Sequence, residues 1–261
     1  MDHITDSKLP RIATAVILRC SVALLASAVL LAPATGQAGP PYLTDDPEPV
    51  GLGHWEVYLA TQHFIGRDMT TGSGPLVDLN YGALPGLHLH VMGQFAYARS
   101  AGGPTFYGVG DTEIGAKIRF VNEGDWLPMM SVYPMVDFPT GDATRGLGTG
   151  RTHAFAPLWL QKSFGPWTTF GGGGLWVNPG TGNRDYWYIG WELQRRISNL
   201  ATVGTEIFYM TPAQIGANAN LGFNVGLVID LSELHHLMLS AGRSIMGDGL
   251  FQGYAAYQLT L

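Results

Sequence analysis

Residues 221–231 read LGFNVGLVIDL, and this stretch decides the fold. Small or polar residues separate its apolar positions, with Val228 as the one exception. The apolar positions are Leu221, Phe223, Val225, Leu227, Ile229 and Leu231. Successive side chains of a strand point to opposite faces, so a period of two predicts a strand with one apolar face and not a helix.

Two more strands of this kind follow, separated by Ser232-Glu233 and by the glycines around Asp248. The last one, residues 251–261, places aromatic, aliphatic and small residues on one face and Gln252, Tyr254 and Gln258 on the other. An apolar strand at an open sheet edge favours aggregation. Closing the sheet in a membrane removes that edge and gives the apolar face lipid to contact. We therefore predict an all-β fold, a transmembrane antiparallel β-barrel.

Composition agrees with a barrel. The 261 residues are 13% charged and 46% hydrophobic, and 36 of them are glycine. A soluble domain carries about 25% charged residues, yet beyond the N-terminus no stretch approaches the roughly 20 apolar residues of a spanning helix. The net charge of −6 and the lack of a Lys/Arg cluster argue against a nucleic-acid partner.

Residues 1–38 have the pattern of a signal peptide. Lys8, Arg11 and Arg19 precede an apolar run from Cys20 to Ala34, and small residues lead up to a cleavage site after Ala38. An uncleaved anchor helix is the alternative, which the short run disfavours. Cleavage would remove the single cysteine. Export of a barrel predicts the outer membrane of a Gram-negative cell, with its lipids and its barrel-assembly machinery as partners.

The mature chain divides into two parts. Residues 39–52 contain PPYLTDDPEPV at positions 40–50, whose four prolines and three acids exclude a strand. We predict an extended N-terminal segment, either a periplasmic lead-in or a segment tucked into the barrel mouth. Its acids could bind a cation, but a solvated acidic loop is the preferred interpretation. Residues 53–261 form the predicted barrel.

Twelve strands are predicted, and their connections alternate in length. The short ones are residues 83–86, 122–125, 165–166, 198–199 and 232–233, and the longer ones are 66–74, 99–105, 140–151, 178–184, 211–218 and 246–249. Short turns at one end and longer loops at the other are typical of an even-numbered outer-membrane barrel. The least certain strands lie in residues 127–177, where Pro134 and Pro157 remove ladder donors.

Charged and histidine side chains are expected on the inner face. Around Lys117, charged residues alternate with Ile114, Ala116, Ile118 and Phe120, which suits water inside and lipid outside. The candidate lumen and selectivity residues are Asp111, Glu113, Lys117, Arg119, Glu192, Arg196, Glu206, His88 and His90. Their mixed signs allow two roles, which do not exclude each other: bracing the wall, with Glu113, Lys117 and Arg119 against Glu192, Arg196 and Glu206, or setting ion selectivity.

No catalytic or metal motif stands out. His88 and His90 lie one strand period apart and could be two metal ligands, but a lumen wall that tolerates histidine is the preferred interpretation. A lipid-modifying enzyme of the outer membrane is a less favoured class, because no His-x-Ser and no Gly-x-Ser-x-Gly occurs. We predict no enzyme activity, no metal and no cofactor.

Several short motifs together resemble a known family. They are Thr44-Asp45-Asp46-Pro47, Asp78-Leu79-Asn80-Tyr81-Gly82, Gly108-Val109-Gly110-Asp111-Thr112-Glu113, Pro139-Thr140-Gly141-Asp142 and the block from Gln161 to Gly174. As a set the chain resembles the outer-membrane barrels assigned to transport in the phenol-degradation meta pathway. The resemblance implies an outer-membrane location and a transport role, and the family's name implies aromatic substrates.

The function predicted from the sequence is therefore passage of a small solute through a narrow barrel lumen. Twelve strands lie between the eight whose interior is just filled by side chains and the sixteen to eighteen that leave an open channel. The alternative is a structural or adhesive barrel whose lumen is plugged. The sequence names neither the solute nor the direction of transport.

Overall fold

The computed structural model describes residues 41–247 and 249–261, so the predicted signal peptide lies outside the described residues. The strands are β1 (Trp55–Ile65), β2 (Met69–Leu84), β3 (Leu87–Ser100), β4 (Thr105–Val109), β5 (Thr112–Val121), β6 (Met129–Val132), β7 (Met135–Phe138), β8 (His153–Phe164), β9 (Trp167–Val177), β10 (Tyr186–Arg196), β11 (Ala201–Met210), β12 (Asn220–Asp230), β13 (His235–Met246) and β14 (Phe251–Thr260). The helical element among the described residues is the 3-10 turn η2 (Ala143–Arg145). In this part of the chain no helix is long and apolar enough to cross a membrane.

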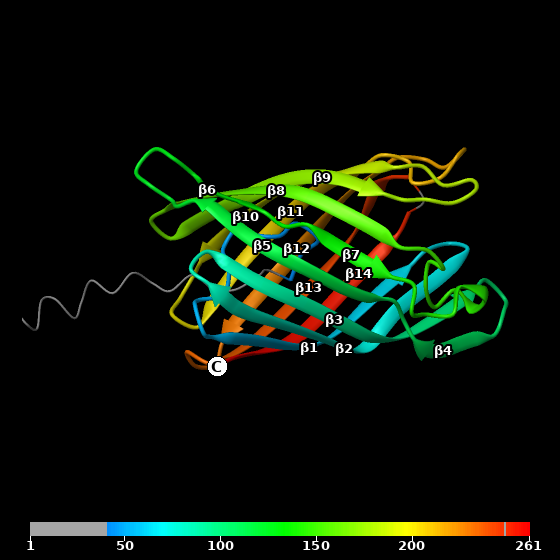
Figure 1. Ribbon diagram of the computed structural model, residues 1–261, viewed down its shortest axis with the longest axis horizontal. Helices are drawn as coiled ribbons and strands as arrows, with labels where there is room; N and C mark the ends of the chain where they lie inside the picture. Colours follow the sequence, from blue (N-terminus) through cyan, green and yellow to red (C-terminus); the bar gives the residue numbers. More distant parts are fainter. Residues whose placement is uncertain (1–40, 248) are drawn as a thin grey trace, which may run out of the picture. The chain divides into compact units, whose positions relative to one another are not determined.

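The strands close into one antiparallel ring (Figure 1). β4 and β5 both pair with β3, so they are one wall strand interrupted at Gly110-Asp111. β6 and β7 both pair with β5 and β8, so they are a second one, interrupted at Tyr133-Pro134. Fourteen segments therefore make the twelve wall strands that the sequence predicts, and β1 pairs with β14 to close the ring.

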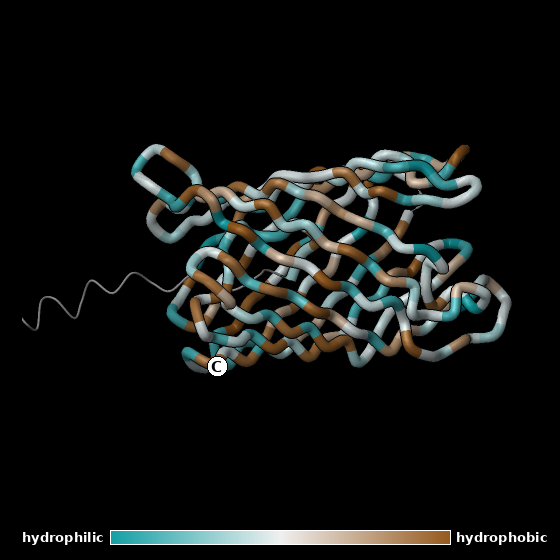
Figure 2. Tube along the Cα trace, in the orientation of Figure 1, coloured by the Kyte–Doolittle hydropathy of each residue, from teal (hydrophilic) through white to brown (hydrophobic). Residues whose placement is uncertain are grey.

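The two faces of the wall differ as the alternation predicts. Ile114, Ile189 and Val225 expose about half of their surface or more on the outside (49%, 54% and 56%), whereas Lys117 and Glu206 are buried inside. Figure 2 shows hydrophobic and hydrophilic residues alternating along the strands. Strict alternation with apolar side chains outward is the pattern of a wall that contacts lipid.

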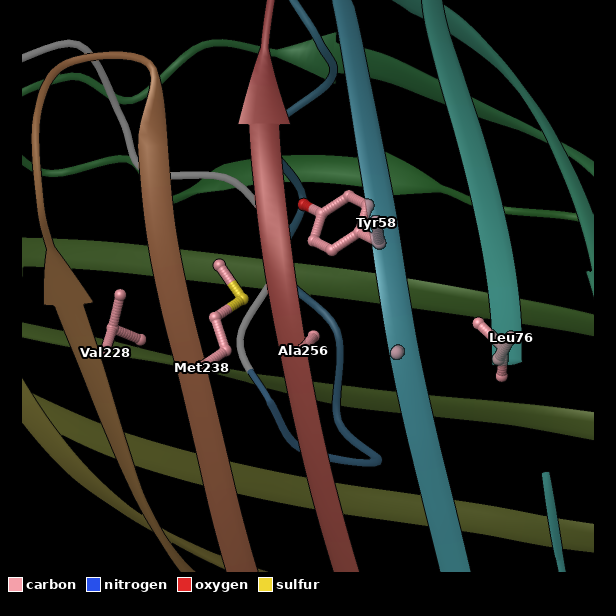
Figure 3. Close-up of a cluster of buried hydrophobic side chains, with 6 residues drawn as sticks. Tyr58, Leu76, Val228, Met238 and Ala256 are labelled. Atoms are coloured by element: carbon pink, nitrogen blue, oxygen red, sulfur yellow. The ribbon is translucent and has the colours of Figure 1, made fainter. Parts of the chain in front are cut away.

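Part of the inner face is itself apolar (Figure 3). One row of the ladder runs across five neighbouring strands, from β12 to β2, and consists of Val228, Met238, Ala256, Ala60 and Leu76. Tyr58 packs against this row. These side chains fill that side of the interior, so open space in the lumen lies elsewhere.

One local prediction needs correction. Residues 66–74 were expected to be a loop, but β2 begins at Met69, because Gly72 pairs with His63 on one side and Tyr97 on the other. Residues beyond the lipid need no apolar alternation, so the hydrophobic pattern did not reveal this extension. Pro157 lies within β8 opposite Gly174, where a Cβ would come within 2.6 Å of Pro157 Cα. The glycine thus makes room for the proline.

Candidate functional site

Residues 41–50, which we call the luminal segment, lie inside the barrel before β1 begins. Thr44, Asp46, Pro47 and Val50 are buried, with Thr44 fully enclosed. Of the two placements predicted for this stretch, the structure has the one within the barrel. The interpretation of its acids as a solvated loop is wrong, because Asp45 and Asp46 contact the Lys117 side chain of the inner wall.

One wall contact of the luminal segment is made by Lys117 of β5. Its Nζ lies 3.0 Å from Asp45 Oδ1 and 3.6 Å from Asp46 Oδ1, and 5.0 Å from the centre of the Tyr133 ring. The Lys117 and Asp46 side chains are each 4% exposed, so water screens this pair little. Burial raises the pKa of Asp46 to about 7, while the charge of Lys117 opposes that rise. On the same side, the Val50 N–H donates to His88 Nδ1 at 3.2 Å.

The opposite wall holds the segment through Glu206 of β11. The N–H groups of Leu43 and Thr44 donate to its carboxylate at 3.3 and 2.5 Å, and the Tyr188 hydroxyl donates at 3.0 Å. The Ser240 hydroxyl of β13 donates to the carbonyl of Pro41. Around the ring of twelve, four wall strands lie between β5 and β11 in one direction and six in the other, so the luminal segment crosses the lumen from one wall to the other.

Glycines in the wall leave room for the crossing. A Cβ at Gly190 of β10 would lie 1.9 Å from Thr44 Oγ1, and a Cβ at Gly82 of β2 would lie 1.8 Å from the carbonyl oxygen of Gly51. No side chain fits at either position while the segment is in place. The wall sequence is therefore adapted to an occupied lumen.

A second polar network surrounds His90 of β3. Its Nδ1 lies 2.9 Å from Asp78 Oδ1, and its Nε2 lies 2.9 Å from Glu113 Oε1. Both ring nitrogens of His90 are therefore paired with carboxylates, and His88 Nδ1 accepts a hydrogen bond from the Val50 N–H. In residues 41–247 and 249–261 no group of three or more His, Cys, Asp and Glu side chains could hold a metal ion.

Space remains between the luminal segment and the wall. A cavity of about 230 Å³ is lined by residues of the segment, among them Tyr42, Asp45 and Glu48, and by wall residues of β1, β2, β3, β5, β7, β8 and β14. The wall contributes acids, His90, Lys117 and aromatic rings. This cavity is open space inside the wall, next to the luminal segment.

The structure brings together some of the predicted lumen residues and separates others. His88, His90, Glu113 and Lys117 surround the cavity, whereas Glu206 lies at the other end of the crossing. The predicted bracing of Glu113, Lys117 and Arg119 against Glu192, Arg196 and Glu206 is wrong for Glu113, which pairs with His90, and for Lys117. Lys117 pairs instead with Asp45 and Asp46, because the luminal segment lies between the two walls.

The remaining predicted residues have different surroundings. Asp111 accepts hydrogen bonds from Gly141 N at 3.0 Å and Thr149 N at 2.7 Å, and so fastens the loop after β7. Glu192 is fully buried opposite Glu206, and neither of its carboxylate oxygens has a hydrogen-bond partner among the described residues. Arg119 is half-buried on β5, and Arg196 is exposed at the end of β10.

Sequence reasoning did not name Asp45, Asp46, Glu56, Asp78 and Tyr188 as site residues. Glu56, Asp78 and Tyr188 carried a usable signal, because each occupies an inward position of an alternating strand. Asp45 and Asp46 carried a signal in their acidity and in the Thr44-Asp45-Asp46-Pro47 motif, but they lie in an irregular stretch without periodicity that would indicate a partner in the wall.

A closed twelve-stranded wall, apolar outside and polar inside, defines the class of outer-membrane β-barrels. No family model matches the chain, and no curated protein matches it. Solved structures do match in fold. An outer membrane channel from Pseudomonas putida F1 is 16% identical with a TM-score of 0.66, and the match covers 83% of this chain and 98% of that chain.

Two further solved structures agree with this fold. The KdgM porin is 9% identical with a TM-score of 0.55, over 78% of this chain and 98% of that chain. The translocator domain of the autotransporter NalP from Neisseria meningitidis is 10% identical with a TM-score of 0.55, over 95% of this chain and 97% of that chain. At these identities the similarity establishes the architecture of the chain only. Its activity has to be inferred from the residues of the site.

Proposed function

We propose that this protein is a channel of the bacterial outer membrane whose lumen its own luminal segment narrows, and that a small solute passes through the remaining space. One observation carries this proposal: a cavity of about 230 Å³, lined by aromatic rings and charged groups, persists beside the segment inside a closed wall. Small-molecule sites are typically concave, with an apolar lining and a few convergent polar groups.

The wall chemistry supports the membrane part of the proposal. Exposed apolar side chains cover the outer face, and separate polar clusters around Lys117, His90 and Glu206 occupy the inner face. Exposing that outer face to water is unfavourable, whereas lipid accepts it. Outer-membrane lipids, the barrel-assembly machinery and a small solute are the partners that this function implies.

The family resemblance suggests an aromatic solute, and the lining agrees with that suggestion. Tyr58, Tyr133, Phe155, Trp159 and Tyr254 all contact the cavity. Aromatic walls favour an apolar or aromatic body in the solute. An enzyme is not part of the proposal.

The test is ion conductance of the purified full-length protein in planar bilayers. We expect small, discrete current steps from the native protein, and larger steps from a variant that lacks residues 41–50. The control variant is Lys162→Gln, which removes an ion pair with Glu123 (3.1 Å) at the short-turn end of the barrel. It should leave the current unchanged.

The second candidate function is a barrel that the luminal segment closes permanently, and the crossing from β5 to β11 is the observation in its favour. It predicts no current and no solute-driven swelling of liposomes from the native protein, with current appearing only after the deletion. Silence from both proteins would refute the channel.

A further inference from the structure

The cavity beside the luminal segment carries more negative charge than its own cations neutralise. Five carboxylates line it, those of Asp45, Glu48, Glu56, Asp78 and Glu113, whereas its cationic groups are Lys117 and His90. Both cations are already engaged, Lys117 with the luminal segment and His90 between two wall carboxylates. The surplus charge of the cavity is therefore anionic.

Two of the wall carboxylates keep a free oxygen. Glu56 Oε2 accepts a hydrogen bond from the Tyr58 hydroxyl at 3.1 Å. Asp78 Oδ1 lies 2.9 Å from His90 Nδ1 and accepts a hydrogen bond from Asn80 Nδ2, also at 2.9 Å. Glu56 Oε1 and Asp78 Oδ2 have no partner among the described residues. Tyr58 is opposite Asp78 in the β1–β2 ladder. The two carboxylates are therefore diagonal neighbours on one inner surface, about 7–8 Å apart between backbone positions, so that one cationic group can lie between their side chains.

Aromatic rings complete the lining. Tyr58 and Tyr254 lie on the β1–β14 side and Tyr133 and Trp159 on the β6–β8 side. Tyr133 already has an ammonium group, Lys117 Nζ, 5.0 Å from its ring centre. Such rings attract cations through their quadrupole and contact the apolar part of a ligand.

Two buried donors in the same lining lack an acceptor. Trp159 Nε1 and His88 Nε2 have no hydrogen-bond partner in the described part of the chain. Because His88 Nδ1 accepts the Val50 N–H, its Nε2 carries the proton in the neutral ring. A buried donor without an acceptor is unfavourable, so a ligand atom that accepts a hydrogen bond would stabilise this region.

We propose that this cavity binds a small organic cation, with its ammonium group against Glu56 and Asp78 and its apolar or aromatic body against the tyrosines. The volume of about 230 Å³ equals roughly eight water molecules at about 30 Å³ each, which admits a small aromatic amine and excludes an oligosaccharide. The inference rests on the proposed channel function and deepens it by naming the class of solute.

The experiment compares three probes that share one ring and differ in charge. Tyramine is a cation, tyrosol is neutral and 4-hydroxyphenylacetate is an anion, and each carries the same phenol group. Isothermal titration calorimetry on the full-length protein in detergent should show saturable binding of tyramine, tenfold or more tighter than binding of either analogue, since charge-assisted hydrogen bonds distinguish them. Equal or tighter binding of tyrosol or of the acid would overturn the proposal.

A pair of variants locates the site. Glu56→Gln should weaken tyramine binding about tenfold and leave tyrosol unchanged. Glu233→Gln, in the exposed turn after β12, should change neither. Tyramine binding that survives Glu56→Gln unchanged would contradict the site. If Glu56→Gln does not fold, as judged by loss of heat-modifiable gel mobility, Asp78→Asn makes the same comparison.

Failure of this inference and failure of the channel function give different results. Tyramine binding in detergent without any bilayer current would retain the cation site and reject the channel. Current without preferential tyramine binding would retain the channel and reject the cation site.

Discussion

Neutralising Lys117 should release the luminal segment while the barrel stays intact. In the variant Lys117→Gln, Asp46 loses its cation while 4% of its side chain is exposed, and Asp45 loses one while 26% is exposed. Removing one member of a buried pair costs about 3–5 kcal/mol. Because water reaches Asp45, we expect the lower end of that range, about 3 kcal/mol.

This cost applies to the inserted state of the segment. Withdrawal places Asp45 and Asp46 in water, so the variant avoids the cost by letting the segment leave the lumen. A change of about 3 kcal/mol raises the ratio of withdrawn to inserted segment roughly 100-fold. The hydrogen-bonded wall does not depend on Lys117, so heat-modifiable gel mobility should be unchanged.

The assay is maleimide labelling of Thr44→Cys, a position that is fully enclosed in the native protein. Cys20 is the only native cysteine and lies in the predicted signal peptide, so the introduced thiol would be the single target. Labelling should be about 100-fold faster in the Lys117→Gln background. The matched control is Lys162→Gln, whose pair with Glu123 is 32% and 21% exposed and contributes about 1 kcal/mol or less. Equal labelling rates in both backgrounds would refute the reasoning.

Three further predictions test other parts of the structure. Gly190→Ala should displace the luminal segment, because the new Cβ would overlap the side chain of residue 44, and maleimide labelling of Thr44→Cys should therefore be faster. The control is Gly93→Ala, whose Cβ would contact nothing within 4 Å. Ile114→Lys should lower the free energy of unfolding in lipid by about 2–4 kcal/mol near the midplane, measured by urea titration in liposomes, and no loss would mean that this face does not contact lipid. Because burial raises the pKa of Asp46 from 3.8 to about 7, the inserted segment takes up a proton as pH falls through 7. Insertion should therefore be strongest below about pH 4 and weaken as pH rises to about 7; a current that falls as pH rises from 5 to 8 would contradict this sign.

Much of the wall could be predicted from the sequence, because a strand's alternation is a local property. The apolar positions of residues 221–231 alternate over their whole length, and the structure has residues 221–230 within β12, with Phe223 on the apolar side and Asn224 buried inside. Lys117 likewise had to face inward, since a slip of one residue would turn it to the lipid. Alternation assigns a face to each side chain in this way, but it does not assign a partner.

Partners in the lumen depend on contacts that are distant in the sequence. Lys117 meets Asp45, 72 residues earlier, and Thr44 meets Glu206, 162 residues later. Such pairs form only once the ring has closed and a segment lies inside it. The sequence offered Lys117 several inward acids, and nothing local favoured residues 45 and 46 over Glu192 or Glu206.

The composition of the luminal segment explains why it can lie across a lumen at all. A stretch inside the barrel but outside its ladder must find an acceptor for each buried N–H, and proline brings no N–H. Prolines therefore reduce the number of backbone N–H donors between residues 41 and 50. Most of the remaining N–H groups donate to side chains. The donors are Leu43 and Thr44 to Glu206, Asp46 to Asp45, Glu48 to Asp46 and Val50 to His88. The same prolines and acids that exclude a strand in the sequence thus suit a segment whose hydrogen bonds come from the wall and from its own carboxylates.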